Sequence, residues 1–212
     1  MPPGGLSVFK PVFYAGLMVW AALAAGCAAA PAATPTAAVP ADITVIDPPK
    51  ATADFMLTDQ TGEMFHLSDL KGKTVLMSFG YTHCPDVCPI TLARFKQIKE
   101  KLGADADRLA FMWVSVDGKR DTPARIAQYI AMFDPAFIAL TGESETVREI
   151  ITEYGGVFVI NDSAGLRKEN YTVDHTASHF LLDADGRWIR TYSYGAPVDT
   201  IVADLQKLLA QG

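Results

Sequence analysis

Residues 74–79 read Thr-Val-Leu-Met-Ser-Phe, a short apolar run without polar alternation. Because a strand covered on both faces needs apolar side chains in both directions, this run predicts a central, doubly covered strand. The run leads directly into a turn that carries Cys84 and Cys88, each followed by a proline. Apolar residues then recur at helical spacing over residues 90–102 and stop before Gly103. The chain is therefore constrained to a strand, a turn with two thiols, and a helix.

The rest of the pattern places this unit in a mixed sheet. A hairpin precedes it, and alternating strands and helices, an antiparallel hairpin and a closing helix follow it. The expected strands are residues 54–59, 63–67, 109–116, 137–140, 177–182 and 188–192, with a small inserted hairpin at 156–160 and 171–174; the expected helices are 123–133, 144–154 and 199–209. This order predicts an α/β, thioredoxin-like fold with a mixed central sheet flanked by helices. In that fold the chemistry lies where the first buried strand meets its helix.

The N-terminal residues 1–27 are typical of an export signal. One charge, Lys10, precedes an uncharged apolar run. The signal ends in Leu-Ala-Ala-Gly-Cys, which resembles a bacterial lipoprotein cleavage site at which Cys27 would be acylated. Residues 12–30 also form an uncharged stretch close to the ~20 residues that span a bilayer, so an uncleaved anchor is the alternative. Both interpretations predict a membrane-anchored, extracytoplasmic protein, either periplasmic or at the outer face of the cell membrane.

Residues 28–50 are rich in alanine, proline and threonine, a composition that buries no core and predicts a semi-extended linker. The folded domain is therefore expected over residues 51–212. The formal net charge of −6 argues against a nucleic-acid partner, because phosphate binding needs a basic face.

The two cysteines of the domain are separated by three residues. Because a residue before proline avoids helical geometry, we expect the helix to begin at Pro89 with Cys88 at its cap. A helix N-terminus favours the thiolate form of a cysteine there. Two such thiolates can bind one metal ion or form a Cys84–Cys88 disulfide, and two buried thiols packed as small apolar groups are a third reading. Structural zinc is disfavoured, because it takes four ligands.

His175 is the histidine best placed to join the cysteines. It lies in the loop before the strand at residues 177–182, and in thioredoxin-like folds this loop lies over the cysteine turn. Ordinary members of the fold carry a cis-proline there, whereas this chain has no proline between Pro135 and Pro197. Two thiolates and one imidazole form a Cys₂His site that suits copper as Cu(I) or Cu(II).

The other candidate residues have simpler interpretations. His66 is expected as a solvated strand residue, and His83 as an accessory neighbour at best. His179 shares the strand parity of His175 but lies about 13 Å further along at the strand rise, so it is expected to be a facing-side strand residue rather than a ligand. Met77 and Met112 are expected to be core residues. Asp174 is a candidate acceptor that would orient His175. Asp117 and Asp121 are expected to cap the following helix or to form an acidic rim beside the site.

Residues 80–89, Gly-Tyr-Thr-His-Cys-Pro-Asp-Val-Cys-Pro, closely resemble the signature of the Sco/SenC copper proteins. Residues 114–123, 140–142 and 171–176 extend the resemblance, which covers residues 51–212. The resemblance implies that Cys84, Cys88 and His175 are copper ligands and that the chain is membrane-tethered. It also implies a metallochaperone that assembles the binuclear copper centre of cytochrome c oxidase subunit II. Gly118 stands where the family usually has proline, in a turn rather than at a ligand.

Two other functions are also compatible with these residues. A thiol-disulfide oxidoreductase that reduces the copper-site cysteines of that subunit needs Cys84 and Cys88 but not His175. A redox or copper sensor would use the same disulfide. Another copper chaperone or a thiol-disulfide reductase is a possible further partner. A thiol peroxidase is disfavoured, because Tyr81 and Pro85 stand where the reactive cysteine needs a threonine three residues before it.

Overall fold

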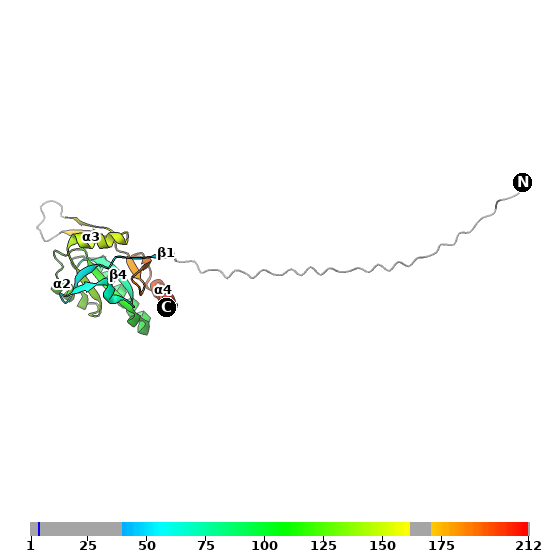
Figure 1. Cartoon of the computed structure of the whole chain (residues 1–212), viewed down its shortest axis with the longest axis horizontal. Coiled ribbons are helices and arrows are strands. Elements are labelled where there is room, and N and C mark those ends of the chain that lie inside the picture. The colour runs from blue at the N-terminus through cyan, green and yellow to red at the C-terminus, as the bar shows by residue number, and fades with distance from the viewer. Residues whose placement is uncertain (1–3, 5–39, 162–170, 212) are drawn as a thin grey trace. The chain divides into compact units, whose positions relative to one another are not determined.

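The computed structural model describes residue 4, residues 40–161 and residues 171–211 (Figure 1). An eight-stranded mixed sheet, in the order β1-β10-β9-β4-β5-β6-β2-β3, forms its centre, and β7 and β8 form a separate pair. The elements in chain order are β1 (Ile43–Lys50), β2 (Met56–Asp59), β3 (Met64–His66), η1 (Leu67–Leu70), β4 (Thr74–Gly80), α1 (Val87–Leu102), η2 (Gly103–Arg108), β5 (Leu109–Ser115), α2 (Pro123–Ala131), β6 (Ile138–Thr141), α3 (Ser144–Glu153), β7 (Phe158–Asn161), β8 (Thr172–His175), β9 (His179–Leu182), β10 (Trp188–Tyr192) and α4 (Val198–Leu209).

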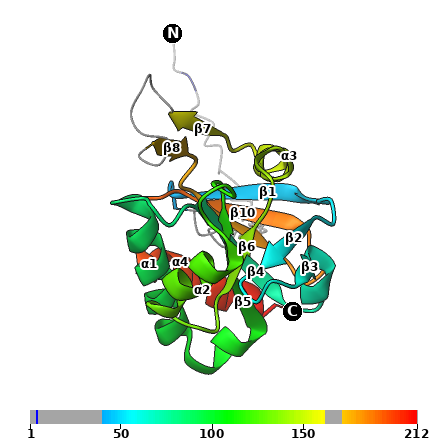
Figure 2. The ribbon, with the colours of Figure 1, turned by 90° about the vertical axis from the view of Figure 1, so that its left-hand side faces the viewer.

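Strand β4 lies in the middle of the sheet, as its sequence predicts. It pairs in parallel with β5 and antiparallel with β9. Leu76 on one face packs with apolar residues of α1, α2 and α4, while Met77 on the other packs with those of α3 and the β7–β8 hairpin. Figure 2 shows α1, α2 and α4 on one side of the sheet and α3 on the other. The prediction of an α/β thioredoxin-like fold with an inserted hairpin is therefore confirmed.

Strand β1 differs from the sequence expectation, which assigns residues 43–50 to the linker. The strand pairs antiparallel with β10, so that Ile43 faces Tyr192, and the fold extends upstream of residue 51. Ile43 is the only buried side chain of β1. Because an edge strand is held by backbone hydrogen bonds on one side, it needs few apolar side chains, and its composition resembles that of a linker.

Apart from residue 4, the expected signal segment, including Cys27, lies outside the described residues, as does most of the expected linker. Its lipidation and its membrane attachment remain predictions. Within the described part of the chain, no helix is both long enough and apolar enough to cross a membrane.

His179 on β9 is fully buried at the centre of the sheet. Its Nδ1 lies 3.2 Å from the hydroxyl of Ser78 on β4, and its ring packs against Phe95 of α1 with centroids 5.4 Å apart. Burial, with a smaller contribution from the positive charge of Arg94, lowers the pKa of His179 to about 4. The folded protein therefore holds this imidazole neutral well below neutral pH.

The buried His179 predicts a loss of stability in mild acid. Below about pH 6.5 the unfolded chain protonates this histidine, whereas the folded chain excludes the proton down to about pH 4. At ~1.4 kcal/mol per pKa unit, the free energy of unfolding should fall by about 2 kcal/mol between pH 7 and pH 5 from this group alone. Urea unfolding at the two pH values measures the change. The His179→Asn variant should lose correspondingly less, and an equal loss in both proteins would contradict the prediction.

Candidate metal centre

The two thiols lie where β4 ends and α1 begins. Gly80 is the last residue of β4, and the turn that follows is closed by a hydrogen bond from the Cys84 amide to the Tyr81 carbonyl, 3.2 Å long. Cys84 lies in this turn and is half-buried, whereas Cys88 in the first turn of α1 is only 1% exposed. The backbone amide of Cys88 donates to the sulfur of Cys84 across 3.5 Å, so the helix N-terminus faces one thiol directly.

Helix α1 begins at Val87, two residues earlier than expected, and Asp86 precedes it as the N-cap. The prediction that Cys88 itself forms the cap is therefore wrong. A proline in the first helical turn removes an amide that has no partner within the helix, so Pro89 is tolerated there. The consequence for the site is small, because Cys88 remains in the first turn.

His175 reaches the cysteines from the inserted hairpin. It is the last residue of β8, where it pairs with Phe158 of β7, and its Nε2 lies 3.4 Å from the Cys88 sulfur. One ligand atom from each of Cys84, Cys88 and His175 lies within 4.8 Å of the other two. The structure thus brings together the three residues that the sequence singles out.

The ring of His175 is oriented by the backbone. Its Nδ1 lies 3.1 Å from the Thr176 carbonyl, and since a carbonyl only accepts, Nδ1 carries the proton and Nε2 offers its lone pair to the thiols. The ring of Tyr81 packs against the imidazole edge to face, at 6.0 Å between centroids. The expectation that Asp174 orients His175 is not met, because its carboxylate accepts from the Asn161 amide at 2.8 Å instead.

The pKa values of the two thiols are shifted in opposite directions. A hydrogen bond from the Cys88 thiol, followed by backbone hydrogen bonds from Asp86 and Cys88, outweighs burial and lowers the pKa of Cys84 to about 5. The same hydrogen bond and deep burial raise the pKa of Cys88. In the metal-free dithiol form, Cys84 is therefore the thiolate and Cys88 keeps its proton.

The other three histidines lie elsewhere. His66 on β3 has a side chain 46% exposed, as expected of a solvated strand residue. His83 is exposed and is not part of the group formed by Cys84, Cys88 and His175; its Nδ1 lies 3.8 Å from Asp121. His179 is buried on β9 beside Ser78.

Comparison with known proteins agrees with this geometry. The SCO1/SenC family model matches residues 44–210. The chain belongs to the SCO1/SenC family. A SCO2-like protein of Rickettsia conorii is 34% identical over 143 residues, which are 68% of this chain and 69% of that protein. The mitochondrial SCO2 homolog of Mus musculus is 35% identical over 161 residues, covering 74% of this chain and 62% of the homolog.

Solved Sco structures share the fold. ScoI of Bradyrhizobium japonicum with copper bound is 37% identical, with a TM-score of 0.65, and covers 73% of this chain and 97% of its own. Apo Sco1 of Thermus thermophilus is 39% identical, with a TM-score of 0.70, and the match covers 78% of this chain and 95% of the Thermus chain. A SCO1/SenC family lipoprotein from Bacillus anthracis is 26% identical, with a TM-score of 0.66, and the match covers 77% of this chain and 98% of the Bacillus chain.

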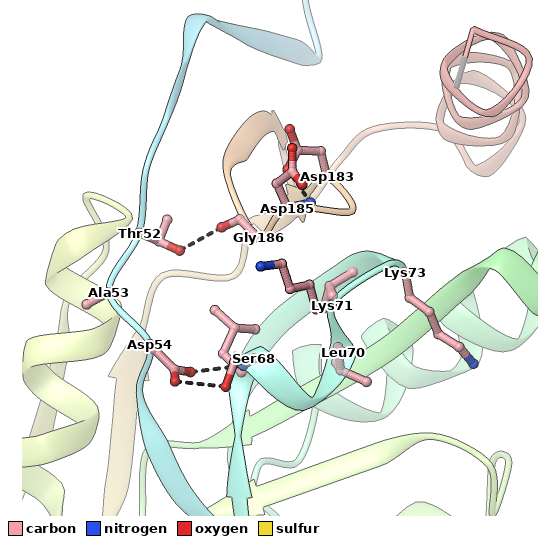
Figure 3. A pocket seen from close by; sticks show the side chains of 12 residues that line it. Thr52, Ala53, Asp54, Ser68, Leu70, Lys71, Lys73, Asp183, Asp185 and Gly186 are labelled. Carbon is pink, nitrogen blue, oxygen red and sulfur yellow. Dashed lines mark hydrogen bonds between the residues drawn. The ribbon is translucent and has the colours of Figure 1, made fainter.

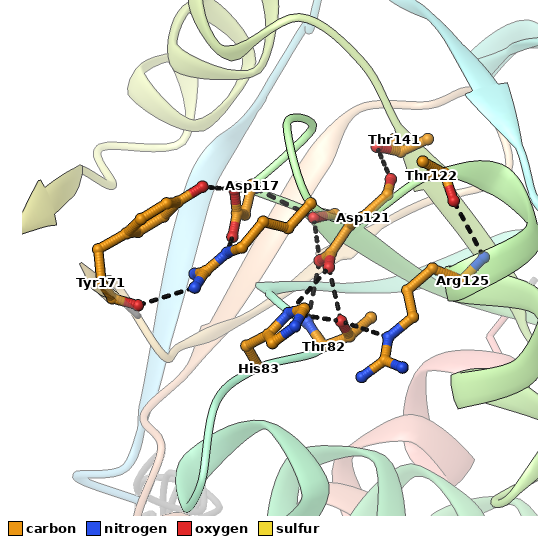
Figure 4. A network of polar contacts seen from close by, with 10 residues as sticks. Thr82, His83, Asp117, Asp121, Thr122, Arg125, Thr141 and Tyr171 are labelled. Atoms are coloured by element: carbon orange, nitrogen blue, oxygen red, sulfur yellow. Dashed lines mark hydrogen bonds and ion pairs between the residues drawn. The ribbon is translucent and has the colours of Figure 1, made fainter. Parts of the chain in front are cut away.

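Asp121 anchors the turn of this Sco-family chain through hydrogen bonds to Thr82 (Figure 4). Its buried carboxylate accepts hydrogen bonds from the Thr82 amide at 2.9 Å, the Thr82 hydroxyl at 2.6 Å and the Ser115 hydroxyl at 2.6 Å. Thr122, not Asp121, caps α2 by accepting from the Arg125 amide at 3.3 Å. The expectation that Asp121 caps the helix or forms an acidic rim is therefore wrong, because the three hydrogen bonds hold it fully buried in the core.

Asp117 joins the end of β5 to the strand that carries His175. It is fully buried, pairs with Arg120, and accepts from the Tyr171 hydroxyl at 2.6 Å. Arg120 also donates to the Tyr171 carbonyl at 2.9 Å and lies over the Tyr171 ring at 3.5 Å. Asp117 and Asp121 come close to His83, but their oxygens are already used by these donors, so the group is a structural network rather than a second ion site.

The sequence gives no local signal for the Arg120–Tyr171 contact, because 51 residues separate the two positions. Both residues lie inside the motifs that resemble the family, yet neither is a metal ligand or a nucleophile. Their importance follows only from the packed structure, in which they fix the start of β8.

A cavity of about 140 Å³ lies at the other end of β4 (Figure 3). Leu67 and Val75 contribute to its apolar lining, and Lys71 and Asp185 are among its polar residues. Val75 and Gly80 are separated by about 17 Å along the strand, at ~3.3 Å per residue. The cavity is therefore separate from the metal centre.

The unequal thiols predict selective alkylation. In the reduced full-length chain carrying Cys27→Ser, iodoacetamide should label Cys84 at a rate that is level above about pH 6 and falls below about pH 5, because its pKa is near 5. Peptide mass spectrometry after timed labelling measures the rate at each thiol.

Substitutions at Cys88 provide the matched control. Cys88→Ala removes the sulfur that donates to Cys84 and should shift the labelling curve to higher pH, whereas Cys88→Ser keeps a hydroxyl donor and should shift it less. A labelling rate that rises steadily up to pH 9 in the unsubstituted dithiol would contradict the assignment.

Proposed function

We propose that this chain is a copper-binding metallochaperone that serves the assembly of cytochrome c oxidase and delivers copper to the binuclear copper centre of subunit II. The observation that carries the proposal is the convergence of Cys84, Cys88 and His175 within 4.8 Å at one edge of the sheet. Membership of the SCO1/SenC family and the likeness to copper-bound ScoI support it.

The donor set fits copper better than other common ions. Two thiolates and one imidazole are soft and intermediate ligands, which suit copper in both oxidation states. Structural zinc takes four protein ligands, and the described residues place no fourth histidine, cysteine or carboxylate in this group. A three-ligand site leaves room for a ligand from a donor or acceptor protein, as a cargo site requires.

The burial of the three ligands suggests the route of release. Cys84 and His175 are half-buried, whereas Cys88 lies beneath them. An acceptor ligand approaching from solvent therefore reaches the side of Cys84 and His175 first. We expect Cys88 to be the last of the three ligands to dissociate from the copper ion.

The N-terminal segment is proposed to hold the domain at a membrane outside the cytoplasm. Residues 1–27 would serve as a lipoprotein signal with acylated Cys27, or as an uncleaved anchor, and the Ala/Pro/Thr-rich residues that follow as a tether. The likeness to the Bacillus anthracis family lipoprotein supports this arrangement. The tether would let the domain reach an oxidase subunit in the same membrane.

A second candidate function is reduction of a disulfide in the recipient subunit. The lowered pKa of Cys84 beside a buried thiol favours it. The Cys84 thiolate would attack the partner disulfide to form a mixed disulfide and release one partner thiolate. Cys88 would then pass its proton to that released thiolate and attack the Cys84 sulfur, which frees the second partner sulfur as a thiolate and leaves a Cys84–Cys88 disulfide. Two electrons pass to the partner, so a thiol-disulfide reductase must restore the chain.

Copper titration separates the two functions. The reduced full-length chain carrying Cys27→Ser, in detergent and without oxygen, should bind one copper per chain. Removing a ligand with His175→Ala should weaken binding by more than about 100-fold and remove or shift the sulfur-to-copper charge-transfer band of the Cu(II) form. His83→Ala is the matched control, because His83 neighbours Cys84 in sequence but lies with Asp121 and outside the Cys84, Cys88 and His175 group.

Either outcome decides between the functions. Strong copper binding that needs His175 but not His83 supports the metallochaperone. If the chain binds no copper tightly and the His175→Ala variant still reduces a disulfide peptide at the wild-type rate, the oxidoreductase is favoured instead.

A further inference from the structure

Two buried hydrogen-bond donors lie beneath the first turn of α1. The indole Nε1 of Trp113 on β5 and the hydroxyl of Tyr129 on α2 have no hydrogen-bond partner among the described residues. Trp113 is completely buried and Tyr129 is 8% exposed, and their rings pack together with centroids 5.6 Å apart. Buried polar groups normally find partners, so two unpaired donors side by side call for an acceptor that the metal-free form does not provide.

The geometry around Gly80 brings the Cys88 sulfur close to the indole nitrogen. A Cβ placed on Gly80 would lie 2.5 Å from the Trp113 Nε1 and 3.0 Å from the Cys88 sulfur. The indole nitrogen and the sulfur are therefore at most 5.5 Å apart, across a space that only glycine leaves open. Both residues that border this space are buried, Cys88 at 1% exposure and Trp113 completely.

Tyr129 faces the same region. Its ring lies against the Trp113 indole, with centroids 5.6 Å apart. Burial raises the pKa of its hydroxyl. Its hydroxyl therefore stays protonated and available as a donor. Trp113 cannot lose its N–H proton at all, so both groups are permanent donors.

We propose that Trp113 and Tyr129 are positioning residues that donate hydrogen bonds to the Cys88 sulfur when Cys88 is a metal-bound thiolate. The inference rests on the proposed copper site. Within the described residues, neither donor has a hydrogen-bond partner, whereas the Cys88 sulfur lies within reach of the indole across Gly80. A metal-bound thiolate carries negative charge in a buried position, where a donor from the core side stabilises it and lowers the electron density on sulfur.

Nuclear magnetic resonance of the unsubstituted full-length chain tests the proposal directly. With ¹⁵N-labelled tryptophan, the Trp113 indole proton should move downfield and exchange more slowly with solvent when diamagnetic Cu(I) is bound. The Trp188 indole already donates to the Arg190 carbonyl at 2.9 Å, so its signal should stay in place and serves as the internal control. Trp113→Phe identifies the Trp113 signal by its loss.

The substituted proteins give a second readout. Trp113→Phe and Tyr129→Phe remove the donors with little change of shape, and should move the sulfur-to-copper charge-transfer band of the Cu(II) form to longer wavelength and weaken copper binding by about tenfold. Trp188→Phe should change neither property.

The outcomes separate this inference from the copper site itself. Copper bound in a 1:1 ratio with an unmoved Trp113 signal overturns the inference and leaves the proposed function intact. Failure of the unsubstituted chain to bind copper overturns both.

Discussion

The metal centre depends on one contact between distant parts of the chain, the 3.4 Å approach of the Cys88 sulfur to the His175 Nε2 across 87 residues of sequence. The cysteine is placed by the end of β4 and the first turn of α1, whereas the histidine is placed by β8, which leads into β9. Because β9 pairs with β4, the central sheet brings both segments to the same edge. The ligand set therefore exists only when the sheet is assembled.

Hydrogen bonding and burial give the ligands different protonation states. The helix N-terminus and the Cys88 thiol stabilise a thiolate on the half-buried Cys84, while burial keeps the proton on Cys88. The Thr176 carbonyl fixes the proton on His175 Nδ1 and frees Nε2. Asp121 and the Arg120–Tyr171 contact hold the turn and β8 in place from the core side. The accessible ligands are thus those that a partner protein would meet first.

Some of this arrangement could be predicted from sequence and some could not. The unalternating run at β4 and the Cys84–Cys88 turn predict both the central strand and the thiols, and the proline-free loop predicts His175. Strand β1 escapes prediction because an edge strand can have the composition of a linker. The role of Asp121 could not be predicted, because an acidic residue before a helix resembles an N-cap. Its hydrogen-bond partner in the core, Thr82, is 39 residues away in the sequence. Trp113 likewise reads as an ordinary core aromatic until its indole nitrogen is located beside Gly80.

The most direct test of the three-ligand site is X-ray absorption at the copper edge of the loaded full-length chain carrying Cys27→Ser. We predict two sulfur ligands and one imidazole nitrogen bound to copper, and loss of the imidazole signal in the His175→Ala variant. A shell with one sulfur, a shell of four sulfurs shared between two chains, or an imidazole signal that survives His175→Ala would contradict it.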